Sequence, residues 1–221
     1  MTSNLTNNQL LDDQTAPARA SRHSWRVVDI VVAAVLGVAC GLIFFAWNSI
    51  GYAWFTTMDA LTPGLGGIAA GIWFLGGPLG MLIIRKPGAA ILVELIGAIV
   101  SALLGNVWGI TTLYSGLAQG LGAELVFALF AYRNFKLPVA LLAGAGAGLG
   151  AWTLELFTSG NLAKGPTFLA IYLTSTVISG IVLAALIYGF FVIKKDDQEV
   201  GGDPFYTDKQ LKAQAAAKAN A

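Results

Sequence analysis

The chain has 221 residues, of which 56% are hydrophobic and only 11% are charged, and its formal net charge is +1. Because soluble domains carry about 25% charged residues, this composition indicates an integral membrane protein. The near-neutral balance implies no general attraction to nucleic acid. With one cysteine and one histidine, the chain lacks the material for an intrachain disulfide or a His-based metal site, and we expect no cofactor.

Residues 1–24 are mostly polar, and we expect them to form a disordered N-terminal tail. Residues 25–195 form the expected membrane domain, which proline, glycine and charged residues divide into six apolar segments of spanning length. Helices are expected throughout, because hydrocarbon offers no partners to an open backbone. The expected spans are 27–47, 61–84, 87–104, 112–131, 137–157 and 167–193, of which the glycine-rich second is the weakest.

The distribution of lysine and arginine predicts the orientation of these spans. Nine of the lysine and arginine residues near the spans fall on one side of the membrane, and we call them the basic cluster. The three connections on the other side, expected at 48–60, 105–111 and 158–166, contain only one basic residue, Lys164. This asymmetry predicts an even number of spans with both termini in the cytoplasm, including a polar tail at 196–221 whose residues 206–219 have helical composition. The basic cluster consists of Arg19, Arg22, Arg26, Arg85, Lys86, Arg133, Lys136, Lys194 and Lys195.

Three carboxylates, Glu94, Glu124 and Glu155, lie within the expected spans. A central acid costs roughly 2.5 to 3.5 kcal/mol to insert, so such residues usually face the bundle interior or a cavity. At about 1.5 Å per residue, Glu94 and Glu124 lie at matching depths roughly 15 Å below the outer surface. We therefore expect these two acids to share one cavity. Glu155 lies only two or three residues from the outer end of its own expected span, 137–157. The alternative for each acid is a structural hydrogen bond between helices.

Small residues at four-residue spacing indicate which helix faces turn inward. Gly116, Gly120 and Glu124 form one such stripe, and Ala90, Glu94, Ala98 and Ala102 form another. Both stripes predict that their acids face neighbouring helices.

Polar and aromatic side chains gather in the outer half of the expected bundle. Any single tryptophan or tyrosine fits an interfacial belt, but Trp152, Tyr172 and Gln119 lie deeper than belt residues usually do. Aromatic faces, amides and carboxylates together suit a flat, nitrogen-rich ligand, especially a cation. The candidate ligand contacts outside the three acids are Trp47, Asn48, Asn106, Trp108, Tyr114, Gln119, Trp152 and Tyr172.

Three short motifs resemble a known family. They are Arg85-Lys-Pro-Gly-Ala-Ala90 with Glu94, Leu104-Gly-Asn106, and Gln119-Gly-Leu-Gly-Ala-Glu124. Together they make residues 25–193 similar to the YkoE-type S components of energy-coupling-factor (ECF) vitamin transporters. S components are the substrate-binding subunits of these importers.

The resemblance implies a multi-pass protein of a prokaryotic cell membrane that binds thiamine or its hydroxymethylpyrimidine precursor near the outer face. It also implies assembly with a transmembrane coupling protein and two cytoplasmic ATPases. The chain itself is then no enzyme, in keeping with its lack of a G-x-x-x-x-G-K-[ST] phosphate loop. The resemblance also implies that the ligand is contacted by four residues of these motifs, Glu94, Asn106, Gln119 and Glu124.

S components often dock on the coupling protein through an Ala-x-x-x-Ala pattern in the first helix. This chain has Ala33, Gly37 and Gly41 at the corresponding spacing, which is still a face for close packing. We therefore expect these three residues to form the docking surface.

Three other functions fit the same residues. A self-contained proton- or cation-coupled carrier would use the acids as a relay, and a scaffold subunit would use them only to join helices. An S component for a different vitamin would keep the architecture and change the ligand.

Overall fold

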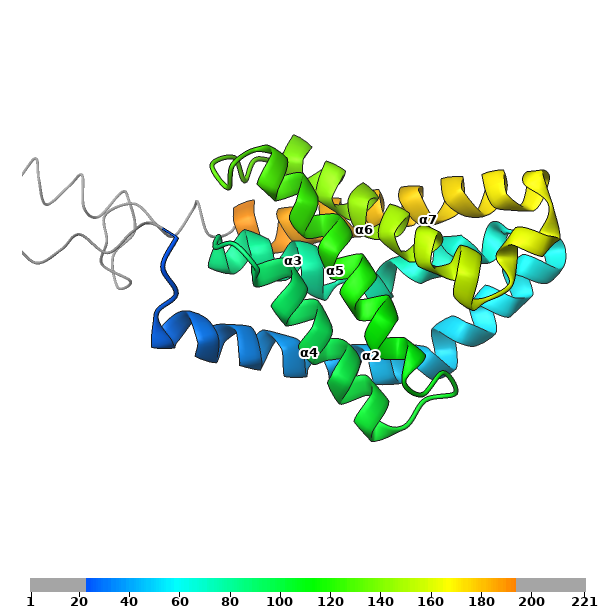
Figure 1. Ribbon diagram of the computed structural model, residues 1–221, viewed down its shortest axis with the longest axis horizontal. Helices are drawn as coiled ribbons and strands as arrows, with labels where there is room; N and C mark the ends of the chain where they lie inside the picture. The colour runs from blue at the N-terminus through cyan, green and yellow to red at the C-terminus, as the bar shows by residue number, and fades with distance from the viewer. Residues whose placement is uncertain (1–22, 194–221) are drawn as a thin grey trace, which may run out of the picture.

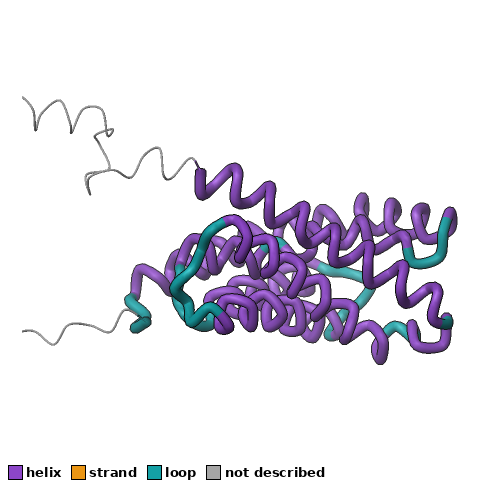
Figure 2. The backbone as a smooth tube through the Cα atoms, turned by 90° about the horizontal axis from the view of Figure 1, so that it is seen from above, coloured by secondary structure: helices purple, strands orange, loops and turns teal. Residues whose placement is uncertain are grey.

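The computed structural model describes residues 23–193, which form a bundle of helices without a strand (Figures 1 and 2). This confirms the prediction of an all-α membrane bundle. Almost all of both expected tails lies outside the described residues, and so do residues 206–219, whose composition is typical of a helix. In chain order the elements are α2 (Val27–Leu61), η1 (Leu65–Phe74), α3 (Gly76–Ile84), α4 (Ala89–Leu104), α5 (Thr111–Leu129), α6 (Leu137–Thr158), η2 (Asn161–Lys164), α7 (Pro166–Ile187) and η3 (Tyr188–Ile193).

The helices form six rods: α2, η1 with α3, α4, α5, α6, and α7 with η3. In Figure 1, α4 and α5 lie oblique to the long axis of the bundle. Four segments, Val27–Leu61, Leu65–Ile84, Leu137–Thr158 and Pro166–Phe190, are long and apolar enough to cross a membrane. Both ends of the described chain lie at the left-hand end of Figure 1, as an even number of crossings requires. We call this the basic end, because it carries Arg26, Arg85, Lys86, Arg133 and Lys136.

The first helix is longer than the sequence pattern predicts. We expected a span of 27–47 followed by an irregular connection at 48–60, but α2 continues for 35 residues to Leu61. At 1.5 Å per residue it is about 52 Å long, well beyond a hydrocarbon layer of about 30 Å. The polar residues after Trp47 do not interrupt the helix, which ends only just before Pro63, where the proline disfavours helical backbone.

The second rod, expected to be the weakest, is broken into two pieces. Gly64 has φ 95° and starts η1, a 3-10 helix that α3 then continues. Side chains of α7 satisfy part of the backbone of η1 and of the residue before it: Ser175 Oγ donates to the Gly64 carbonyl and Ser179 Oγ to the Ile68 carbonyl, both at 2.7 Å. Irregular backbone at membrane depth persists only where protein groups satisfy it in this way.

The second half of the bundle is held by close approach of small residues. Gly144 on α6 and Gly180 on α7 face each other so closely that a Cβ on either would meet the other's carbonyl oxygen. Gly122 on α5 and Gly146 on α6 form a second contact of the same kind. Such contacts replace the hydrophobic effect as the source of helix association in lipid.

The register between α4 and α5 decides where Glu124 lies. A Cβ at Gly116 would contact Ala98, and one at Gly120 would contact the α4 backbone at Ile91, so the predicted inward stripe is confirmed. One turn further toward the basic end, Glu124 reaches the start of α4. Its two carboxylate oxygens accept hydrogen bonds from the backbone N–H groups of Gly88 at 2.6 Å and Ala90 at 3.0 Å.

Glu124 thus satisfies donors that the first turn of a helix leaves open, and its negative charge suits that helix terminus. The same α3–α4 turn is held from the other side by Lys86, whose Nζ lies 2.5 Å from the Asp29 carboxylate of α2. Trp25 Nε1 also donates to the Pro87 carbonyl at 2.9 Å. The basic end is therefore tied together by buried polar contacts among α2, α4 and α5.

We expect Glu124→Ala to destabilise the bundle, because it leaves the N–H groups of Gly88 and Ala90 buried without an acceptor. The loss should be about 1–3 kcal/mol, since an unsatisfied buried donor costs about that much. Glu124→Gln keeps one acceptor oxygen and should lose less. Thermal unfolding of the purified protein in detergent measures both, and equal midpoints for the three proteins would contradict the capping role.

Candidate ligand-binding site

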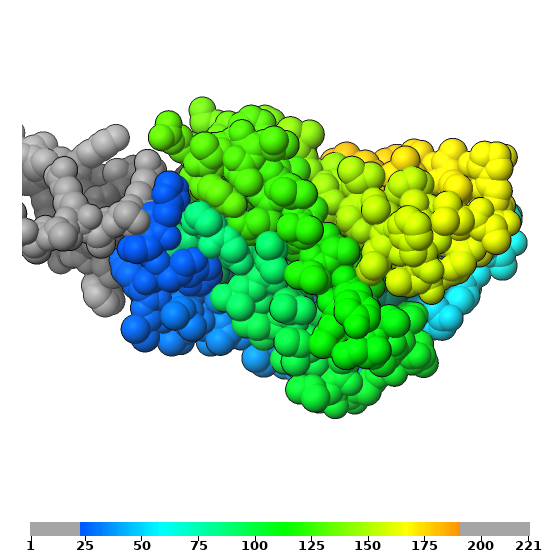
Figure 3. Space-filling view, in the orientation of Figure 1, coloured from blue at the N-terminus to red at the C-terminus, as the bar shows by residue number. Residues whose placement is uncertain are grey.

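A cavity of about 320 Å³ lies between the two halves of the bundle, in the part farther from the basic end. Its walls come from α2, η1, α4 and α5, and from the α6–α7 region including η2. The α4–α5 and α6–α7 connections, which contribute Trp108 and Asn161, supply its rim. In the space-filling view these connections, green near residue 110 and yellow near residue 160, form neighbouring parts of the surface (Figure 3).

Glu94 is the deepest residue that α4 contributes to the cavity, and it is only 1% exposed. Its Oε2 accepts a hydrogen bond from Gly77 N at 2.6 Å, while its buried Oε1 has no partner in the described part of the chain. A Cβ at Gly76 would press on the Glu94 backbone, so the glycine pair lets α3 approach α4 closely. An unpartnered buried acceptor is costly unless a ligand supplies a donor.

One face of α4 and one face of α5 form the polar wall above Glu94. Ser101 lies two turns from Glu94 on α4, and Gln119, 6% exposed, faces the cavity from α5. Asn48 of α2 donates to Ser101 Oγ at 2.9 Å and accepts from Trp73 Nε1 at 2.9 Å. This chain of bonds fixes the side chains of α4, α2 and η1 relative to one another.

Aromatic rings form two further walls. Trp108 packs edge-to-face on Tyr52 at 5.1 Å and on Trp73 at 5.7 Å between ring centroids. Tyr52 also stacks on Phe55 at 6.4 Å, and Phe55 packs on Tyr172 at 6.1 Å. Such rings bury a large area and leave flat faces for a planar ligand.

The outer part of the cavity carries charge. The Tyr172 hydroxyl donates to the Glu155 carboxylate, and Lys164 Nζ lies 4.3 Å from the centre of the Phe168 ring. All four residues line the cavity. The site therefore combines a deep carboxylate oxygen, flat aromatic walls and a polar mouth, which suits a planar ligand with N–H donors.

The cavity brings together six of the eleven expected ligand contacts. They are Asn48, Glu94, Trp108, Gln119, Glu155 and Tyr172. Glu94 and Glu155 thus share the cavity, whereas Glu124 lies outside it, one helical turn nearer the basic end.

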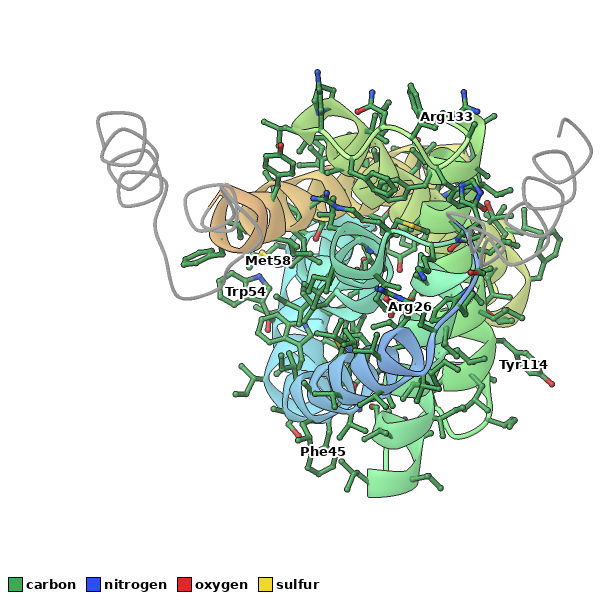
Figure 4. The ribbon with its side chains drawn as sticks, turned by 90° about the vertical axis from the view of Figure 1, so that its left-hand side faces the viewer. Arg26, Phe45, Trp54, Met58, Tyr114 and Arg133 are labelled. Carbon is green, nitrogen blue, oxygen red and sulfur yellow. The ribbon has the colours of Figure 1, made fainter. Side chains whose placement is uncertain are left out.

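The other four expected contacts also lie outside the cavity lining. Tyr114 is 55% exposed and points away from the bundle (Figure 4). The indole N–H groups of Trp47 and Trp152 donate to the carbonyls of Ala69 and Leu169, joining helices instead. Asn106 organises the α4–α5 connection through its own backbone neighbours.

The expected docking stripe faces inward in the structure. Ala33, Gly37 and Gly41 are all buried, and Cβ atoms at the two glycines would collide with Ile96 and Val100 of α4. The small residues serve close packing, as predicted, but their partner is α4 of the same chain. This face is therefore not presented on the surface of the described chain.

Several lining residues were missed by the sequence analysis, notably Phe55, Trp73 and Ser101. Phe55 falls at helical spacing from Asn48 and Tyr52. This spacing was not recognised because the first span was expected to end at residue 47, whereas α2 continues to Leu61. Ser101 lies seven residues from Glu94 on the same face of α4. Trp73 lies on the 3-10 segment, whose facing no regular helical period predicts.

Comparison with known proteins places this geometry in a family. The family model of the permease component of the ABC-type cobalt transport system matches residues 28–150. Within the described residues no group of three His, Cys, Asp or Glu side chains is placed to hold a metal ion.

A curated relative, the HMP/thiamine permease protein YkoE of Bacillus subtilis (strain 168), is 37% identical over 168 residues, which are 74% of this chain and 81% of the relative. A crystal structure of an S component of an ECF transporter superposes with a TM-score of 0.63 at 29% identity, covering 90% of this chain and 99% of that one. The chain is therefore a membrane transport subunit and not an enzyme, and it belongs to the YkoE-type family of ECF transporter S components.

Proposed function

We propose that this chain captures thiamine or its hydroxymethylpyrimidine precursor in the cavity above Glu94, for uptake driven by ATP hydrolysis on partner chains. The observation that carries the proposal is the buried, unpartnered Oε1 of Glu94 at the base of an aromatic cavity. The name of the Bacillus subtilis relative supports this choice of ligand. Partners are proposed from the family: a transmembrane coupling protein and two cytoplasmic ATPases.

The chemistry of an aminopyrimidine fits this arrangement. Its exocyclic amine offers N–H donors to the free oxygen of the buried Glu94 carboxyl group. The rings of Trp108 and Tyr172 offer flat faces to the heterocycle, and Gln119 offers an amide to fix its orientation. A thiazolium ring would gain further from the aromatic faces and from Glu155 near the mouth.

The proposed orientation places the basic end in the cytoplasm, following the usual excess of lysine and arginine on that side. The cavity, which lies in the part of the bundle farther from the basic end, then opens toward the outside. This is the geometry that an importer needs to collect its ligand before transport.

Binding should depend on the free oxygen of Glu94. In Glu94→Gln the amide oxygen can still accept from Gly77 N, but an NH₂ group then faces the ligand in place of an acceptor. We expect affinity for thiamine and hydroxymethylpyrimidine to fall about 10- to 100-fold, because a ligand N–H donor is left buried without an acceptor. Quenching of intrinsic tryptophan fluorescence measures this, because Trp73 and Trp108 line the cavity.

Glu124→Gln is the matched control, since it makes the same chemical change one turn outside the cavity and should leave affinity within about twofold of the parent. Riboflavin and biotin test for another vitamin. Saturable quenching by either, with none by thiamine or its precursor, would overturn the choice of ligand. A parent that bound none of these compounds would favour the scaffold alternative.

The orientation is testable with single-cysteine variants, because the native Cys40 is only 1% exposed. Ala163→Cys on η2 and Lys136→Cys at the basic end both replace exposed residues. We expect a membrane-impermeant maleimide to label the first but not the second in intact cells, and both after permeabilisation. The reverse pattern would place the basic end outside.

Transport should require the partner chains. In liposomes, we expect the purified chain alone to bind thiamine but not accumulate it, and accumulation to appear when coupling protein, ATPases and ATP are supplied. A self-contained carrier would instead show uptake by the chain alone that follows an imposed pH or cation gradient. The two outcomes separate the ECF proposal from the carrier alternative.

A further inference from the structure

We infer that Asn106 is a positioning residue: its side chain holds the α4–α5 connection in the shape that sets Trp108 as a wall of the cavity. The residue acts without touching the ligand. The inference rests on the proposed function only where ligand release is the readout.

The side-chain oxygen of Asn106, Oδ1, accepts three hydrogen bonds. It accepts hydrogen bonds from Trp108 N at 2.9 Å, from Gly109 N at 2.8 Å and from Thr112 Oγ1 at 3.1 Å. An asparagine that bonds the backbone two residues ahead mimics a turn of the chain itself. Here one atom joins the start of the connection, the backbone of Trp108 and the first turn of α5.

Apart from the packing of the Trp108 ring, few contacts hold the connection in place. Gly105 and Gly109 have φ of 103° and 54°, and a Cβ on either would meet nothing within 4 Å. Glycine at these positions therefore allows the positive φ of the backbone and does not serve close packing. Val107 and Ile110 are 78% and 63% exposed. In the described chain, the hydrogen bonds of residues 105–110 reach only as far as residues 102 and 113.

The Trp108 ring is the group through which this connection reaches the aromatic wall. Tyr52 and Trp73 hold that ring edge-to-face, and Trp73 is itself fixed through Asn48 and Ser101. Trp73 is therefore fixed by hydrogen bonds, while the backbone of Trp108 depends on Asn106. Loosening residues 106–109 would let one wall of the cavity move.

A direct ligand contact by Asn106 makes a different prediction. Its Nδ2 is buried and has no partner among residues 23–193, yet Asn106 does not line the cavity. If Nδ2 served the ligand, loss of the donor would matter and loss of the acceptor would not. Asn106→Asp separates these roles, because it keeps an acceptor for all three bonds and removes the donor.

The test compares Asn106→Ala and Asn106→Asp with the parent. Asn134→Ala is the matched control, since Asn134 makes a similar local bond to Lys136 N at 3.1 Å in the connection at the basic end. Hydrogen exchange of the Trp108 and Gly109 amides, measured without ligand, reports the connection directly. Stopped-flow fluorescence with thiamine as the probe reports ligand release.

In Asn106→Ala we expect exchange at these amides and thiamine release each to speed up about tenfold, with exchange in the rest of the bundle unchanged. Asn106→Asp and Asn134→Ala should stay within about twofold of the parent in both readouts. If Asn106→Ala does not fold, Asn106→Ser, a weaker turn former, should give an intermediate increase in exchange.

Unchanged exchange in Asn106→Ala, or in Asn106→Ser in its place, would overturn the inference. Fast thiamine release in Asn106→Asp with parent-like exchange would also overturn it, in favour of a ligand contact through Nδ2. If the parent bound no thiamine, the proposed function would fail, while exchange at Trp108 and Gly109 would still decide the role of Asn106.

Discussion

The carboxylate of Glu94, held between α3 and α4 in the membrane interior, is the constraint on which the cavity depends. Gly76 and Gly77 bring α3 close enough to bond one oxygen, and the other oxygen remains free. Inserting such a group is costly, so a sequence retains it where a partner offsets the cost. The break between η1 and α3 is part of the same arrangement, because it places the Gly77 N–H at this carboxylate.

Two acids of similar predicted depth have different surroundings, and the cause is one helical turn of register. The sequence spacing predicted correctly that Glu94 and Glu124 both face inward. It did not reveal that Gly120, opposite Ile91, places Glu124 at the open N–H groups of α4. The direction in which a side chain faces follows from the helical period of its own segment. Which residues it contacts depends on the axial register between two helices, and the sequence of one helix does not determine that register.

Much of the fold followed from composition and spacing, and the exceptions have physical reasons. The six rods were predictable because backbone groups in lipid demand helices. The continuation of α2 beyond Trp47 was not, because a polar residue marks the membrane surface without ending a helix. The inward turn of Gly37 and Gly41 was also missed, since a small-residue face looks the same whether α4 or another protein covers it.

Amides in this protein illustrate why a polar residue near a site is not automatically a ligand contact. Asn48 and Asn106 were both expected to touch the ligand. Asn48 does line the cavity, but its amide also bonds Ser101 and Trp73, whereas Asn106 lies outside the lining and bonds its own turn. Each fixes a tryptophan that lines the cavity. Rigid walls lower the entropy cost of binding, so these amides would support affinity through shape, while the free oxygen of Glu94 supplies the directional contact. Under the proposed function, selectivity would arise from one carboxyl group in a preorganised aromatic frame.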